Sequence, residues 1–161
     1  MSRGEILKSL SRSEVFNGLE DDELELLCDC SQKAAFKESD TLVREGEVVP
    51  AFCVIMKGQL RVFLPQQIEG RREERVSPVK LNILKEGDCF GEYSIIGEMP
   101  ASASIVATQP GELIRIPRGD LNRVLMENDH IASVVYHNML RILIGRLRKR
   151  EKEYDLILVV G

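Results

Sequence analysis

Residues 33–117 break into short segments in which apolar and polar side chains alternate, and a glycine-containing turn separates most of them. Alternation with a period of two is typical of strands that bury one face, and glycine provides the positive φ that tight turns need. Many short strands at close spacing predict a closed, mainly β architecture, either a sandwich or a roll. The strands we expect are 34–37, 41–44, 51–57, 59–64, 79–84, 102–107 and 113–116.

A helical period flanks this β region on both sides. Two short helices are expected within residues 3–19, and Asp21 and Asp22 are placed to cap a third. After the β region, a short helix is expected at residues 120–126, followed by a long one from residue 129 to at least residue 153. The sequence therefore divides into N-terminal helices (1–32), a β-roll (33–117) and C-terminal helices (118–161).

The long helix carries two apolar stripes. The first, Ile131, Val135 and Ile142, is expected to cover the β-roll. The second has the spacing of a coiled-coil seam, which predicts a parallel homodimer; the alternative is a single helix folded back on its own barrel. The residues of this second stripe are Tyr136, Leu140, Leu143, Leu147, Tyr154 and Ile157.

A basic cluster accompanies the second half of this helix. Its members are Arg146, Arg148, Lys149, Arg150 and Lys152. Acidic residues interleave with it, so we interpret it as a solvated helix face rather than a nucleic-acid site. The net charge of −4 over 161 residues also argues against nucleic acid as the main partner, because such binding needs a concentrated positive face.

The segment most typical of a binding site is residues 87–107, where Gly87 and Gly91 precede a few apolar residues that suit one helical turn. A helix N-terminus with unpaired amides binds anions, and phosphate is the usual one. Glu92, at the start of this turn, is an acceptor for sugar hydroxyls. From Ser102 the period returns to two, which predicts that a strand leaves the turn.

Phe90-Gly91-Glu92 and Ser102-Ala103-Ser104 resemble the phosphate-binding cassette of the cyclic nucleotide-binding domain superfamily, which includes the catabolite activator protein and the regulatory subunit of protein kinase A. The resemblance covers nearly the whole chain. It implies that Glu92 binds the ribose 2′-hydroxyl, that the amides after Gly91 hold phosphate oxygens, and that Ser102 adds a hydroxyl. The ligand-binding residues that it implies are Phe90, Gly91, Glu92, Tyr93, Ser94, Ala101, Ser102 and Ala103.

The chain departs from this pattern at Ala101, where the family has its phosphate-binding arginine. Loss of a charge-assisted hydrogen bond of about 1.5–3 kcal/mol corresponds to roughly 10- to 100-fold weaker binding. The long helix of the family touches the bound base. By this analogy, Arg146 and Arg150 are tentative substitutes for the missing charge.

No early apolar run is long enough for a signal peptide or a membrane span, so we expect a cytoplasmic protein without membrane attachment. The chain has four cysteines, Cys28, Cys30, Cys53 and Cys89. We expect them to be reduced, and because they form no CxxC pair we expect neither a metal site nor a cofactor. His130 and His137 lie seven residues apart with no acidic third ligand placed near them, and we interpret both as ordinary helix residues.

These observations predict a regulatory sensor and not an enzyme. It would bind a small-molecule effector, either a cyclic nucleotide (cyclic AMP or cyclic GMP) or a related anion, and signal through its C-terminal helix to an unidentified downstream protein. The alternative is a non-binding scaffold or dimerisation module, which Ala101 favours and Glu92 disfavours. Transcription factors of the resembled superfamily continue into a helix-turn-helix; this chain stops at Gly161, so we expect no DNA-binding domain.

Overall fold

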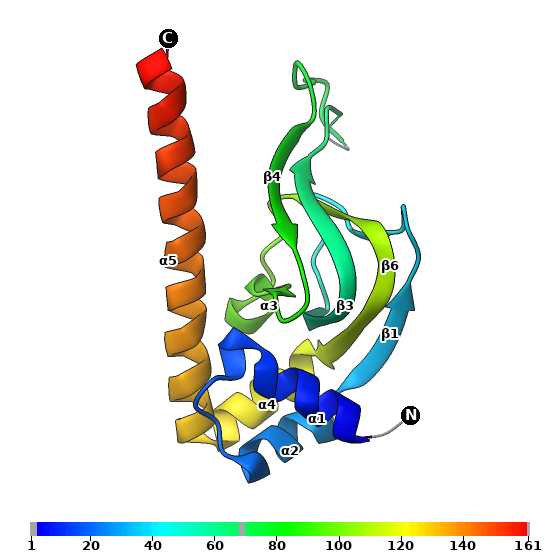
Figure 1. Ribbon diagram of the computed structural model, residues 1–161, viewed down its shortest axis with the longest axis vertical. Helices are drawn as coiled ribbons and strands as arrows, with labels where there is room; N and C mark the ends of the chain where they lie inside the picture. Colours follow the sequence, from blue (N-terminus) through cyan, green and yellow to red (C-terminus); the bar gives the residue numbers. More distant parts are fainter. Residues whose placement is uncertain (1–2, 68–69, 161) are drawn as a thin grey trace.

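The computed structural model describes residues 3–67 and 70–160, apart from the side chains of Ser94 and Val160. Its centre is a β-roll (Figure 1), so the predicted mainly β architecture is confirmed. The described strands form one antiparallel sheet in the order β1-β6-β3-β4, with β2 paired to β6 and β5 paired to β3. They are β1 (Gln32–Phe36), β2 (Thr41–Val43), β3 (Ala51–Leu64), β4 (Val79–Leu84), β5 (Cys89–Phe90) and β6 (Ser104–Pro117).

The two longest strands, β3 and β6, each continue through a glycine where the sequence suggested a turn. Gly58 has a φ of +95°, and a Cβ there would lie 2.6 Å from the Pro110 carbonyl oxygen. A Cβ on Gly111 would collide with the carbonyl oxygen of Lys57. The glycines therefore allow two paired strands to approach closely at irregular register, as in a β-bulge. The predicted breaks at these positions were wrong.

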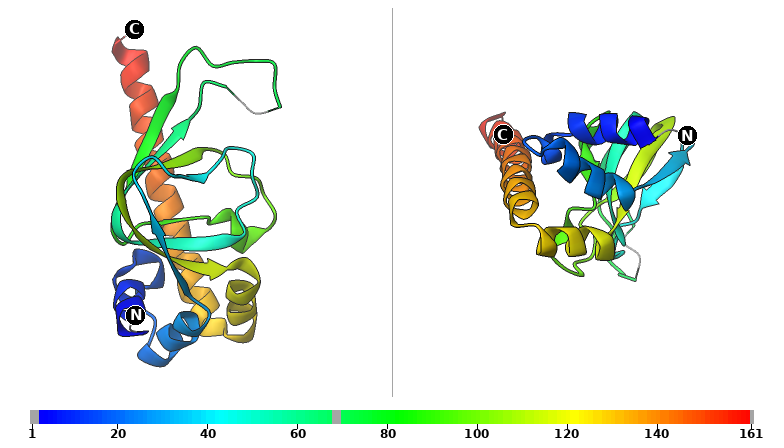
Figure 2. Two further views of the ribbon diagram at one scale, coloured as in Figure 1. Left: turned by 90° about the vertical axis from the view of Figure 1, so that its right-hand side faces the viewer. Right: turned by 90° about the horizontal axis from the view of Figure 1, so that it is seen from below.

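Helices cover one end and one side of the roll. α1 (Arg3–Arg12), η1 (Glu14–Phe16), α2 (Asp21–Asp29) and α4 (Arg118–Glu127) gather at one end, and α5 (Asp129–Val160) rises along the side (Figures 1 and 2). None of the helices in the described ranges is long and apolar enough to cross a membrane.

The start of α2 differs from the prediction. Its N-cap is Glu20, whose backbone N–H donates to Glu23 Oε2 at 2.9 Å. Asp21 and Asp22 lie in the first turn instead, where negative charge interacts favourably with the helix dipole. Glu23 also contacts α5, because its Oε1 lies 2.6 Å from His130 Nδ1. His130 therefore has an acidic partner from a distant helix, which the sequence did not suggest.

Two hydrophobic clusters lie on the two faces of the sheet, because successive side chains of a strand point to opposite faces. Along β3, Phe52 and Val54 belong to the cluster beneath the helices, whereas Cys53 and Ile55 belong to the one inside the roll. The rings of Phe16 and Phe52 meet edge to face at 6.0 Å, which ties the N-terminal helices to the sheet.

α5 packs on the roll through its N-terminal half only. Ile131 and Val135 are fully buried and Ile142 is half-buried against the same cluster, as predicted for the first stripe. Leu143 also packs there, so its assignment to the outward stripe was wrong. The other residues of that stripe are exposed by 45–70%: Tyr136, Leu140, Leu147, Tyr154 and Ile157.

The β3–β4 hairpin projects beside the free half of α5 (Figure 1). Most of the described residues at its tip are exposed, and residues 68–69 lie outside the described ranges. Arg75 is different. It makes paired hydrogen bonds to Glu45 at 2.9 and 3.0 Å and a third to the Pro65 carbonyl at 2.7 Å. Arg75 thus joins the hairpin to the turn after β2.

Candidate functional site

A cavity of about 310 Å³ lies between the β-roll and α5. Its wall on the roll side is aliphatic and aromatic, and its wall on the opposite side comes from one face of α5. The roll contributes Val43, Val49, Val62, Leu84, Phe90 and Ile105, among others. The helix contributes Leu143, Arg146, Leu147, Lys149 and Arg150.

The predicted binding segment borders this cavity. The predicted ligand-binding residues that line the cavity are Phe90, Gly91, Glu92, Tyr93, Ala101, Ser102, Ala103, Arg146 and Arg150. Ser94 lies in the same short helix, but its side chain is outside the described part of the structure. The structure therefore brings together residues that are up to sixty positions apart in the chain.

Gly91 sets the path of the backbone into the site. It has a φ of +81°, and a Cβ at this position would collide with the carbonyl oxygen of Ala51 at the start of β3. Only glycine fits such a conformation at such a close approach. The chain then forms the predicted helical turn, α3 (Tyr93–Ile96), which follows Glu92 directly.

Glu92 is held by the long helix. Nη1 of Arg146 donates to Glu92 Oε1 at 3.1 Å, and Nη2 of Arg146 donates to the Cys89 carbonyl at 2.8 Å. Both side chains are mostly buried, with 17% of Glu92 and 28% of Arg146 exposed. The sequence suggested that Arg146 leans over the pocket, and it does reach the cassette, but its partners there are a carboxylate and a carbonyl.

Ala101 carries no charge, and both its backbone N–H and its carbonyl are hydrogen-bonded within the protein. The Ala101 N–H donates to the Glu47 carbonyl at 2.7 Å, and the Ala101 carbonyl accepts from the Gly46 N–H at 2.8 Å. The turn after β2 thus fixes this part of the cassette. Ser104 has a similar structural role, since its buried hydroxyl accepts from the Glu45 N–H at 2.9 Å.

The hydroxyl of Ser102, which was expected to bind the ligand, has a hydrogen-bond partner within the cassette. Tyr93 Oη donates to Ser102 Oγ at 3.3 Å, so the two hydroxyls face the cavity together. Neither the tyrosine contact nor the helix wall could be inferred from local spacing. Lys149 was missed as a lining residue; its Nζ lies 3.4 Å from Asn82 Oδ1 of β4.

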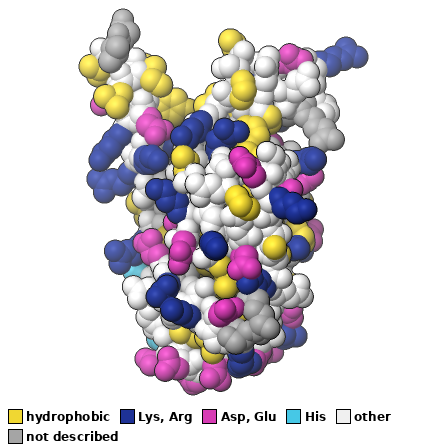
Figure 3. All heavy atoms as spheres, turned by 45° about the vertical axis from the view of Figure 1, so that its right-hand side comes forward, with side chains coloured by type: hydrophobic (Ala, Val, Ile, Leu, Met, Phe, Trp, Pro, Cys, Tyr) yellow, Lys and Arg dark blue, Asp and Glu magenta, His cyan; other side chains and the backbone are white. Residues whose placement is uncertain are grey.

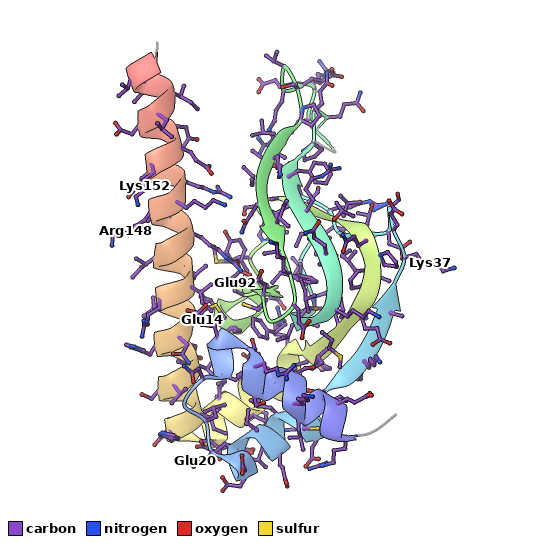
Figure 4. The ribbon with its side chains drawn as sticks, in the orientation of Figure 1. Glu14, Glu20, Lys37, Glu92, Arg148 and Lys152 are labelled. Carbon is purple, nitrogen blue, oxygen red and sulfur yellow. The ribbon has the colours of Figure 1, made fainter. Side chains whose placement is uncertain are left out.

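Figure 4 shows where several charged side chains of the site and of α5 lie. Glu92 lies between α5 and the strands, whereas Arg148 and Lys152 lie on the side of α5 away from the roll. The basic cluster predicted as one solvated face is therefore divided between the two sides of the helix. Arg146, Lys149 and Arg150 border the cavity.

The four cysteines are free thiols, and three of them are buried. Burial raises the pKa of both Cys53 and Cys89 to about 12, so these thiols stay protonated at neutral pH. Within the described ranges, no three His, Cys, Asp or Glu residues are grouped so that they could hold a metal ion.

A family model described as cyclic nucleotide-binding domain matches residues 33–128, which run from β1 through α4 and include the cassette. The chain belongs to the cyclic nucleotide-binding domain family. The match ends at the start of α5, so the helix wall of the cavity lies outside it.

Similar proteins include enzymes and receptors that are longer than this cyclic nucleotide-binding domain. It is 32% identical over 130 residues to the cGMP-dependent protein kinase egl-4 of Caenorhabditis briggsae, covering 80% of this chain and 17% of the kinase. It is 28% identical over 145 residues to the cyclic AMP receptor protein of Thermus thermophilus, covering 90% of this chain and 62% of the receptor. The chain thus spans less than two thirds of either relative.

Solved structures share its fold. A cyclic nucleotide-binding domain from Methylobacillus flagellatus aligns with a TM-score of 0.76 at 26% identity, covering 99% of this chain and 84% of that one. The catabolite activator protein of Thermus thermophilus aligns with a TM-score of 0.70 at 28% identity, covering 90% of this chain and 63% of that one.

Proposed function

We propose that this chain is a regulatory sensor that binds a cyclic nucleotide or a related anionic effector in the cavity between the cassette and α5. The observation that carries the proposal is that one cavity is shared by Glu92 of the cassette and Arg146 of the long helix. A ligand in this position contacts both elements at once. Its binding free energy can therefore change how α5 is held.

The ligand chemistry follows from the lining. Glu92 accepts hydrogen bonds from sugar hydroxyls once Arg146 shares it or moves aside, and Ser102 offers a further hydroxyl. The described lining residues include no histidine or cysteine that would pair as base and nucleophile. We therefore propose a binding module rather than an enzyme.

The output of the sensor is proposed to pass through α5. The exposed apolar stripe along α5 has the spacing of a coiled-coil seam, and burying it would remove large apolar side chains from water. A parallel homodimer accounts for this stripe, and a downstream protein would then respond to the dimer. A cytoplasmic location is part of the same proposal.

A second candidate function is a non-binding scaffold, which two observations favour. Ala101 supplies no charge to the cassette, and Arg146 already occupies the Glu92 carboxylate. In this alternative, the Arg146 contact is a structural tie between α5 and the roll, and the dimer is the whole function.

Thermal unfolding with and without millimolar cyclic AMP or cyclic GMP distinguishes the sensor from the non-binding scaffold. A ligand present at 100 times its Kd stabilises the folded state by about 2.7 kcal/mol, which raises the Tm of a protein of this size by roughly 5–10 °C. If the chain is a sensor, the wild type should show such a shift in Tm. Glu92→Ala should abolish the shift, whereas Glu127→Ala, on the exposed surface of α4, should retain it. No shift in the wild type or in Ala101→Arg supports the scaffold.

A further inference from the structure

The charges around the cavity are unevenly placed. Among the charged residues that line it, the three cations Arg146, Lys149 and Arg150 all belong to α5, and the single anion Glu92 belongs to the cassette. Apart from Glu92, the roll contributes no charged group to the described lining. The cavity therefore has a positive wall on the helix and an apolar wall on the roll.

Two of the three cations are available to a ligand. Arg146 is committed to Glu92 and to the Cys89 carbonyl. Lys149 makes only a long contact of 3.4 Å to Asn82, and Arg150 forms no ion pair with any residue in the described ranges. Lys and Arg side chains gather along the middle of α5 and in the notch beside the β3–β4 hairpin (Figure 3).

The cassette offers little to an anion at residue 101. The Ala101 amide already donates to Glu47, and its methyl group faces an aliphatic wall that includes Val43, Val49 and Ile105. An anionic group placed against this wall would lose its water without gaining a charged partner, which is costly. The same group placed on the helix side would meet two cations.

We propose that the effector binds with its anionic group directed at Lys149 and Arg150 of α5 and with its apolar or flat part against the β-roll. The ligand class is an organic anion of about mononucleotide size with one face able to cover aliphatic side chains. This proposal rests on the proposed function and specifies the orientation of the ligand. It makes α5 itself the charge-recognising element of the site.

Matched variants test the orientation. Lys149→Gln/Arg150→Gln removes two cations from the cavity side of α5, and Arg148→Gln/Lys152→Gln removes two from the opposite side, so the net charge changes equally. The probes are cyclic AMP against adenosine, and anilinonaphthalene sulfonate against uncharged phenylnaphthylamine. Within each pair, the ratio of affinities reports the contribution of the anionic group.

The wild type is expected to prefer the anion of each pair. This preference should fall by about 10-fold or more in Lys149→Gln/Arg150→Gln, and should stay within about 3-fold in the control pair. If the preference survives the cavity-side substitutions, the anionic group faces the cassette, which overturns the orientation while the sensor function stands. If the wild type binds none of the four probes, both the sensor function and the orientation are overturned.

Discussion

Arg146 of α5 donates a hydrogen bond of 3.1 Å to Glu92, which precedes it by 54 residues and begins the helical turn of the cassette. The same guanidinium reaches the carbonyl of Cys89 at 2.8 Å. One side chain thus joins the projecting helix to the two ends of the tight turn at Gly91. This contact lies where the packed half of α5 gives way to its exposed half.

Arg146→Ala should destabilise the protein by about 1–2 kcal/mol, because it leaves a mostly buried carboxylate without its charged partner. Urea unfolding measures the loss, and Arg141→Ala, an exposed position on the same helix, should cost under about 0.5 kcal/mol. In a double-mutant cycle, Glu92→Gln should reduce the cost of Arg146→Ala. Strictly additive effects would contradict an energetic link between the two side chains.

Gly91→Ala should cost at least about 2 kcal/mol, because it combines a positive φ with a collision against the Ala51 carbonyl. Gly46→Ala is the matched control: its φ is +89°, but a Cβ there would meet no atom within 4 Å. We expect the control to cost about 1 kcal/mol. Equal losses in the two variants would mean that the close approach to β3 has no energetic weight.

The ion pair between Arg75 and Glu45 should make stability depend on pH. The hydrogen bonds from Arg75 lower the pKa of Glu45 in the folded protein below its ordinary value of 4.5. A carboxylate with a lowered folded-state pKa stabilises the protein above its unfolded-state pKa, and this contribution is lost as the pH falls through the folded-state value. The stabilisation is therefore fully present at pH 7 and begins to be lost as the pH falls below about 4.5.

Arg75→Ala should accordingly be destabilised relative to the wild type by about 1 kcal/mol at pH 7, and the difference should shrink between pH 4.5 and pH 3. Arg72→Ala, in the exposed part of the same hairpin, should show no such pH dependence. The measurement is urea unfolding at each pH. A difference that persists unchanged at pH 3 would assign the effect of Arg75 to its Pro65 contact.

The exposed stripe of α5 should control the oligomeric state. Leu140 is 60% exposed, and Leu140→Asp would place a charge in the predicted seam. Light scattering is expected to give a dimer for the wild type and a monomer for this variant. Met126→Asp, at a position on α4 that is 84% exposed, should leave the dimer intact. A monomeric wild type would exclude the coiled-coil arrangement.

The sequence predicted the β-roll, the cassette turn and the buried stripe of α5 because each depends on local periodicity. Ile131 and Val135 could be assigned to the core since they recur at the helical period. The continuity of β3 and β6 could not be predicted, because Gly58 and Gly111 lie where two paired strands approach closely and do not form turns. Local sequence does not distinguish these two uses of glycine.

The contacts that complete the site were harder to predict because they join distant residues. Lys149 lies beside Asn82, and Arg75 binds Glu45, only because the roll places β4 and the hairpin against other elements. Arg146 could be suggested by analogy, but its partner could not. Long polar side chains reach several ångströms in many directions, so their pairing depends on tertiary structure.

Because α5 packs on the roll only up to about Arg146, and the contact of Lys149 with Asn82 lies less than one turn beyond it, the rest of the helix projects from the cavity like a lever. The helix continues to Val160, and a rise of about 1.5 Å per residue places its end roughly 21 Å beyond Arg146. A tilt of about 10° at the cavity would then displace the tip by about 4 Å. In the proposed sensor, a small shift at Glu92 would thereby become a larger movement at the tip of the helix.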